Sequence, residues 1–302
     1  MLLSVSIDLD EMHHYRAIHG LSPVDGPAVY ARAVPRLADW ARQRGIPLTW
    51  FVVGADLELA ANAEAVRRLA AAGDELGCHS YSHHYDLTRR SAGEMRREIE
   101  RGISILQAAS GTKVTGFRAP GYVVTDTLLD LLRELGMAYD SSVFPCPSYY
   151  ALKAGAIAAA AARRQPSAAI VDVPEVLRAP TAPYRVGRPF WFRGTGIWEV
   201  PIQVTRRARL PFIGTSLTMA GAIGARLLAK GVVGEAFVNL ELHGIDALDE
   251  RDDASDLAKR QRDLRIPWPK KLEAIDAAIS LLRRKGYTCV RLDELAAQAR
   301  LA

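Results

Sequence analysis

His79 and His83 are two histidines four residues apart, a type and spacing that could hold a metal ion. The Ser-Tyr-Ser residues between them favour a compact loop in which the two imidazoles converge. Two neutral imidazoles and one carboxylate leave a divalent ion with an open coordination position, as in catalytic rather than structural metal sites. The pair therefore indicates a metal-dependent hydrolase, and the alternative is two surface or structural histidines.

Two carboxylates far upstream, Asp8 and Asp10, end the apolar run that opens the chain. On a strand, residues two apart point to the same side. Both carboxylates could therefore face one site, one binding the metal and the other acting as a general base. These residues alone leave open which is which. They also leave open a role in capping a helix or bonding a loop.

Two further candidates follow apolar runs. His243 comes directly after residues 236–242, where an imidazole could act as a general acid for a leaving amine, or could be a buried structural histidine. Arg118 could pair with a catalytic carboxylate and hold its orientation. The Pro120-Gly121 turn after it could offer backbone N–H groups to an oxyanion, or could be an ordinary turn between a strand and a helix.

The elements that must position these residues alternate between strand and helix. Predicted strands cover residues 2–8, 46–53, 75–78, 114–118, 137–140, 170–175, 197–201, 236–242 and 287–292. Predicted helices cover residues 28–44, 58–72, 91–109, 126–135, 154–164 and 269–285, with a capping box at Ser91 and Glu94. This alternation predicts an α/β fold with a parallel sheet. Every candidate residue lies where a strand ends, which is where barrel folds carry their sites.

The alternation weakens between residues 146 and 235, and we interpret this segment as an insertion or cap within a single domain of residues 1–302. Residues 180–192 are predicted to form an aromatic loop, and residues 246–263 a charged loop or lid. The uncharged stretch 210–225 is too short, and too interrupted by Pro211 and glycines, to span a membrane. It could lie on a membrane, cover a lipid, or be a surface-packed helix.

Charge and cysteine content restrict the class of protein. The 302 residues carry a net charge of +5 without a long basic block, which gives no indication of nucleic-acid binding. The three cysteines, Cys78, Cys146 and Cys289, are odd in number and far apart, so we expect reduced thiols.

The short apolar N-terminus is not typical of a signal peptide. We therefore expect a cytoplasmic protein, with peripheral contact at the inner membrane face as an open alternative; the oligomeric state is not predicted.

Taken together, these motifs resemble the polysaccharide deacetylases with a NodB-type homology domain (carbohydrate esterase family 4 and relatives). The motifs that carry the resemblance are residues 6–10, 79–83, 118–122 and 240–243, supported by residues 139–145 and 198–201. The resemblance implies a distorted (β/α)7 barrel with bound Zn²⁺, or another divalent metal such as Co²⁺ or Ni²⁺.

The resemblance also implies roles for individual residues. Asp10, His79 and His83 would hold the metal. Asp8 would be the general base, with Arg118 orienting it. The metal and the backbone N–H of Tyr122 would stabilise the oxyanion, and His243 would protonate the departing amine.

One departure from the family pattern concerns the first motif, which has Asp-Leu-Asp where many members have adjacent acids. This variant resembles members that act on a formylated, lipid-linked amino sugar, and others that act on peptidoglycan-like or ring-amide substrates. We expect hydrolysis of an N-acetyl or N-formyl group from an amino sugar or lipid-linked glycan. The alternatives are a non-sugar cyclic or linear amide, such as a ureide, and an inactive module that binds glycan or lipid.

Overall fold

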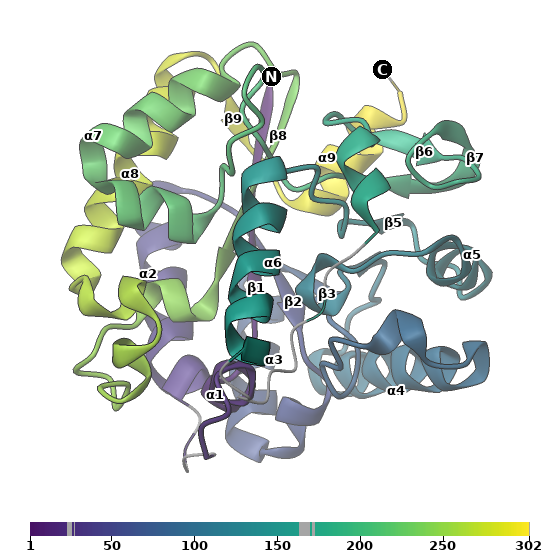
Figure 1. The fold of residues 1–302 in the computed structure, drawn as a ribbon, viewed down its shortest axis with the longest axis horizontal. Helices are drawn as coiled ribbons and strands as arrows, with labels where there is room; N and C mark the ends of the chain where they lie inside the picture. The colour runs from purple at the N-terminus through teal and green to yellow at the C-terminus, as the bar shows by residue number, and fades with distance from the viewer. Residues whose placement is uncertain (23–25, 27, 163–169, 171–172, 302) are drawn as a thin grey trace.

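The computed structural model describes residues 1–22, 26, 28–162, 170 and 173–301, and its core is a curled sheet (Figure 1). The strands lie in the order β6-β7-β5-β4-β3-β2-β1-β8, and β9 pairs with the start of β1. Their bounds are β1 Leu2–Leu9, β2 Leu48–Val52, β3 Glu75–Cys78, β4 Gly116–Phe117, β5 Tyr139–Asp140, β6 Tyr184–Val186, β7 Arg193–Glu199, β8 Phe237–His243 and β9 Thr288–Cys289. Strand β1 lies between β2 and β8, so the first acidic motif is central to the sheet.

An irregular segment closes the sheet into a barrel. In the described part of the chain seven strands, from β8 through β1 to β5 and β7, run parallel around the barrel, and β6 is antiparallel to β7. Beyond β7, the Ile202 N–H donates to the carbonyl of Val143, and the Gln203 N–H donates to the carbonyl of Asn239 on β8. These two bonds connect the irregular segment after β7 to Val143 and to β8, and they close a seam in the barrel. They do so without the repeated hydrogen bonds of a regular strand pair. The predicted distorted (β/α)7 barrel is confirmed.

Helices surround the sheet, as Figure 1 shows, with α7 beside α8 at one side and α4 and α5 at the other. Helix α6 passes across the middle of this view. The helices are α1 Met12–Ile18, α2 Val34–Arg44, α3 Ala60–Ala71, α4 Ala92–Ser110, α5 Asp126–Glu134, α6 Pro147–Ala162, α7 Gly214–Val232, α8 Trp268–Arg284 and α9 Leu292–Ala299.

Sequence patterning accounts for most of these elements. Both faces of β1 are buried, as is typical of a parallel strand covered by helices, and its large apolar residues alternate with the small, buried Ser4 and Ser6. Helix α2 ends at Gly45, whose φ of 60° lies in the left-handed region that glycine adopts without strain. Helix α4 begins with the predicted capping box, in which the Ser91 and Glu94 side chains each accept from the other's backbone N–H.

Several predicted boundaries were wrong. Helix α6 begins at Pro147 rather than at residue 154, and residues 163–164 lie outside the described residues. Of the strand predicted at 170–175, residues 171–172 are also outside them, and a 3₁₀ helix covers Pro174–Arg178. The predicted loop 180–192 contains β6. Helices α1 and α9 were not predicted, because seven- and eight-residue segments show too little periodicity.

The uncharged stretch 210–225 forms most of α7, which packs against α8. Its outer face exposes Met219 and Ile223, of which Ile223 is 75% exposed. Among the helices of the described residues, none has the length and apolar character needed to cross a membrane. Within the predicted insertion, β7 pairs with β5 in the main sheet. The single-domain assignment and the insertion boundaries at 146 and 235 remain predictions.

Candidate active site

A cluster of one aspartate and two histidines lies at the carboxyl ends of β1 and β3. The Oδ1 atom of Asp10 is 3.2 Å from Nε2 of His79 and 3.2 Å from Nε2 of His83. All three side chains are buried. Three ligand atoms bound tetrahedrally at about 2.1 Å from a Zn²⁺ ion would be about 3.4 Å apart. The observed spacing therefore fits a three-ligand transition-metal site.

The two histidines are held by their backbone and by one carbonyl. Nδ1 of His79 lies 2.7 Å from the carbonyl oxygen of Arg118, so it donates and leaves Nε2 free as a ligand. The loop turns at Ser80 and His83, whose φ values of 62° and 53° are left-handed. The His83 N–H donates to Oγ of Ser80 at 3.1 Å, which stabilises this turn. The predicted loop conformation is thus the one that brings the two imidazoles together.

The electrostatics of these ligands suit a cation. Burial raises the pKa of Asp10, but the neighbouring His83 and His79 outweigh burial and hold it well below its usual value. Burial lowers the pKa of His83 to about 4, so this imidazole is neutral at neutral pH. Oδ1 of Asp10 and Nε2 of His83 are buried with no hydrogen-bond partner among the described residues. Buried polar atoms without partners are costly, and a bound metal ion would satisfy both.

Asp8 lies beside this cluster but pairs with an arginine. Its Oδ1 accepts from Nη1 of Arg118 at 2.6 Å, and both side chains are almost completely buried. The guanidinium also donates to Ser6 Oγ at 2.9 Å and to Ser141 Oγ and the Ser141 carbonyl at 2.8 Å each. The Phe51 ring lies 4.2 Å below the guanidinium carbon. The arginine is thereby fixed from several sides and orients Asp8.

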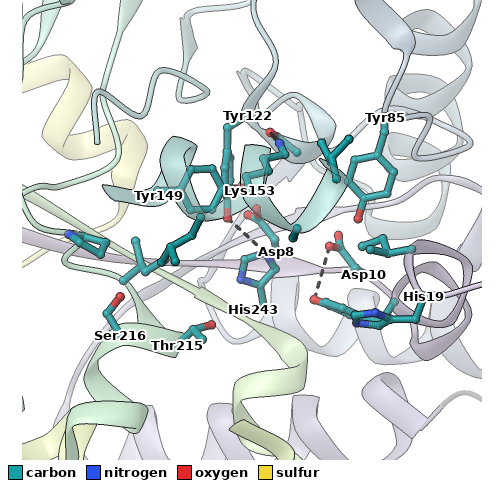
Figure 2. A pocket seen from close by; sticks show the side chains of 18 of the residues that line it. Asp8, Asp10, His19, Tyr85, Tyr122, Tyr149, Lys153, Thr215, Ser216 and His243 are labelled. Atoms are coloured by element: carbon teal, nitrogen blue, oxygen red, sulfur yellow. Dashed lines mark hydrogen bonds between the residues drawn. The ribbon is translucent and has the colours of Figure 1, made fainter. Parts of the chain in front are cut away.

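His243 is placed by a carboxylate that the sequence analysis did not single out. Nδ1 of His243 lies 2.8 Å from Oε1 of Glu241, two residues earlier on β8. Nε2 lies 3.1 Å from the Tyr122 hydroxyl (Figure 2). Burial alone lowers the pKa of His243, but the Glu241 carboxylate raises it more, with a net pKa well above the usual value. The imidazole is therefore cationic at neutral pH and carries a proton to donate.

The Tyr122 backbone has a different partner from the one the resemblance implied. Gly121 and Tyr122 both adopt left-handed conformations, with φ values of 63° and 62°. The Tyr122 N–H donates to the carbonyl of Ala119 at 3.0 Å within a 3₁₀ turn, while its hydroxyl contacts His243. The role of the Tyr122 backbone N–H as an oxyanion donor remains a prediction.

These groups surround a cavity of about 460 Å³, which Figure 2 shows. Its inner side, called here the catalytic floor, consists of Asp8, Asp10, His79 and His243, with Arg118 buried behind Asp8. Its outer side, called here the apolar wall, consists of Ile18 at the end of α1, Leu152 and Ile157 on α6, and Ile213 before α7. Leu152 is 76% exposed, so the wall continues onto the molecular surface.

Helix α1 contributes residues that the sequence analysis missed. The Tyr15 hydroxyl donates to Oδ2 of Asp10 at 3.4 Å, and the ring of His14 lies 4.5 Å from the ring of His83. The pair Glu241 and His243 shares one face of β8, a signal that the two-residue strand period could have given. The sequence-predicted residues Asp8, Asp10, His79, His83, Arg118, Tyr122 and His243 all meet at this site.

Comparison with known proteins identifies the class. Residues 25–139 match the family model for polysaccharide deacetylase, a range that contains His79, His83 and Arg118. Over 150 residues the chain is 25% identical to a peptidoglycan deacetylase from Helicobacter pylori, covering 47% of this chain and 50% of the relative. The chain thus spans about half the length of that curated relative.

Solved structures share the fold. A Mycobacterium smegmatis protein assigned to the polysaccharide deacetylases superposes with a TM-score of 0.62 at 16% identity, covering 99% of this chain and 90% of the other. A family 4 acetyl xylan esterase from Clostridium thermocellum, solved with a cobalt ion, gives a TM-score of 0.51 at 16% identity over 99% and 91% of the two chains. The resemblance stated from the sequence is confirmed: residues 25–139 match the polysaccharide deacetylase family model, and the solved structures share the fold.

Proposed function

We propose that this protein is a metal-dependent hydrolase that removes an N-acyl group, acetyl or formyl, from an amino sugar. The observation that carries the proposal is the arrangement at the catalytic floor. Asp10 and His79 of the floor converge with His83 at metal-ligand spacing, beside two separate proton-handling groups, Asp8 and His243. A structural metal site would need neither of these two groups at the edge of a cavity.

Asp10, His79 and His83 are the residues that would hold the ion. Their two imidazole nitrogens and one carboxylate oxygen suit Zn²⁺, and also Co²⁺ or Ni²⁺. When bound, such an ion supplies Lewis acidity, which polarises the acyl oxygen and makes water more acidic. Of these three residues, Asp10 and His79 line the cavity.

Asp8 and His243 divide the proton transfers between them. The Asp8 carboxylate, held by Arg118, takes a proton from the attacking water. His243, kept cationic by Glu241, gives a proton to the departing amine nitrogen. The two residues are register partners on β1 and β8, so base and acid approach the acyl group from neighbouring strands.

Separate observations support the character of the substrate. A relative named as a peptidoglycan deacetylase supports an N-acetylated sugar. The apolar wall, with Leu152 open to the surface, supports a substrate that carries a lipid. The exposed residues Met219 and Ile223 on α7 support peripheral contact with a membrane. A cytoplasmic location at the inner membrane face is part of this proposal.

The experiment that tests the proposal measures bound metal and acyl release together. Wild type and Asp10→Asn would be reconstituted with Zn²⁺ or Co²⁺ and assayed on N-acetyl and N-formyl amino sugars, free and lipid-linked. Asp39→Asn is the matched control, because Asp39 forms an exposed ion pair with Arg42. We expect metal-dependent release by wild type and the control, and none by Asp10→Asn.

Other outcomes would redirect the proposal. Metal binding with turnover of ureides but not of acylated sugars would favour the non-sugar amide alternative. Metal or glycan binding without turnover of any of these substrates would favour an inactive binding module. Release that is unchanged by chelation of the metal and by Asp10→Asn would contradict the mechanism itself.

A further inference from the structure

A second group of metal-ligand side chains lies next to the first, outside the cavity. His13 and His14 are in the first turn of α1, and Asp56 lies in the short helix that follows β2. One nitrogen from each histidine and one carboxylate oxygen of Asp56 lie within 4.8 Å of one another. None of these residues lines the cavity of the catalytic floor.

The geometry of this group is unusual for neighbouring helical residues. Consecutive side chains on an α-helix point about 100° apart and normally diverge. Here the rings of His13 and His14 lie with their centroids 4.0 Å apart, and Nε2 of each is 3.8 Å from Oδ1 of Asp56. A tetrahedral ion needs ligand atoms about 3.4 Å apart, so a small inward movement of the two imidazoles would complete the contacts.

Burial gives an independent indication that this group binds a cation. The side chain of Asp56 is 4% exposed, and its Oδ2 has no hydrogen-bond partner among the described residues; the same holds for Nε2 of His14. At 3.8 Å, neither histidine is within hydrogen-bond distance of the Asp56 carboxylate. A buried carboxylate oxygen without a hydrogen bond is costly unless a cation satisfies it. The first metal group shows the same signature, in Oδ1 of Asp10 and Nε2 of His83.

We propose that His13, His14 and Asp56 form a second metal site, which binds a divalent transition-metal ion. Two imidazoles and one carboxylate select Zn²⁺, Co²⁺ or Ni²⁺ over Mg²⁺ or Ca²⁺, which prefer oxygen ligands. His13 is partly exposed, with 45% of its side-chain surface open to solvent, and this gives an ion a route of entry. The proposal does not depend on the proposed hydrolase function.

The second site would act through position rather than chemistry. The His14 ring lies 4.5 Å from the ring of His83, so an ion that fixes His14 would also restrain a ligand of the first site. Because the second ion is outside the cavity, it would not contact the substrate. We therefore expect occupancy of the second site to strengthen metal retention at the first, not to replace it.

Metal stoichiometry tests this proposal directly. Wild type, His13→Ala, Asp56→Asn and Asp10→Asn would be dialysed against saturating Zn²⁺, and bound metal measured by mass spectrometry. We expect two equivalents in wild type and one in each of the three variants. His84→Ala is the matched control, because His84 has a single carboxylate neighbour, Glu98 at 3.9 Å, and should retain two equivalents.

The outcomes separate the two sites. If wild type binds only one equivalent, or if His13→Ala and Asp56→Asn both retain two, the second site does not exist. If Asp56→Asn does not fold, His13→Ala decides alone, because His13 is partly exposed and its loss leaves the buried carboxylate in place. One equivalent in Asp10→Asn, lost in the double variant with His13→Ala, would support the second site even if no hydrolysis is found.

Discussion

The catalytic floor and the apolar wall of the same cavity are built in opposite ways. On the floor, polar groups are fixed by short contacts: Arg118 donates to Asp8 at 2.6 Å, and His243 lies 2.8 Å from Glu241. On the wall, Leu152 is 76% exposed, and it comes from a helix rather than from a strand end. On the floor, Asp8 and His243 each have a fixed partner of opposite charge, whereas the wall depends on exposed apolar side chains.

This difference separates reaction from selection. Catalytic groups must be held close to their working geometry, and buried charge pairs on parallel strands do so. An apolar surface has little directional preference, so it can accept different lipid or acyl shapes. Changes on the floor should therefore affect turnover and stability, and changes on the wall should affect which substrate is used.

The largest effect is expected for Asp8→Asn on the floor. An amide cannot take a proton from water, so kcat for acyl release should fall by about 10²–10⁴-fold. Metal content should remain unchanged, because the proposed ligands are Asp10, His79 and His83, whereas Asp8 is paired with Arg118. Steady-state kinetics with a metal assay on the same sample measures both, and a kcat within a few-fold of wild type would remove Asp8 as the base.

Arg118→Leu should have the next largest effect, on stability. Removing one partner of a buried ion pair leaves the Asp8 charge uncompensated, which costs about 3–5 kcal/mol in the free energy of unfolding. Urea denaturation would measure the change. Arg42→Leu, which breaks the exposed pair with Asp39, should change stability by less than about 1 kcal/mol. Equal effects of the two substitutions would contradict the rigid floor.

Glu241→Gln should move the pH dependence of activity. In wild type the raised pKa keeps His243 protonated at neutral pH, and the acid form is lost only as pH rises through that raised value. Without the Glu241 charge, burial lowers the pKa, so the alkaline limb of kcat/KM should shift to lower pH. Glu235→Gln, which affects a carboxylate paired with Arg206 away from the cavity, is the control. An unshifted alkaline limb would exclude Glu241 as the group that raises the pKa of His243.

The smallest effect is expected on the wall. Leu152→Ser removes exposed apolar surface, so KM for a lipid-linked amino sugar should rise by about 5–10-fold, which corresponds to about 1–1.4 kcal/mol of apolar contact. Kinetics with the free sugar should be unchanged. Leu301→Ser, at an exposed leucine near the C-terminus, should alter neither. A loss of activity on both substrates would mean that the wall and floor are not separate.

The sequence was sufficient for those parts of the site that rest on strand periodicity. Asp8 and Asp10 point to one side because strand residues alternate, and the strand-end position of His79 follows from the alternation of strand and helix. Glu241 carried the same signal relative to His243, but a buried apolar strand gave no reason to assign a carboxylate to the site. Its role depends on the 2.8 Å contact.

Other parts could not be predicted because they depend on tertiary packing. Tyr15 and His14 reach the site on a seven-residue helix, which is too short to be recognised by periodicity. At the barrel seam, a backbone hydrogen bond joins Gln203 in the irregular segment to Asn239 on β8. No local sequence pattern indicates this bond. Apart from Ile18 on α1, the wall comes from α6 and the segment before α7, where the alternation of elements is weakest.

The register of β1 and β8 also determines when the site can form. Asp8 and His243 lie opposite each other in this register, which a hydrogen bond between Ser6 and Asn239, 233 positions apart in the chain, helps to hold. Contacts between such distant residues form slowly, because closing the loop between them is entropically costly. Asp8 and His243 therefore meet only after residue 243 has been synthesised, and their pairing marks a late event in folding.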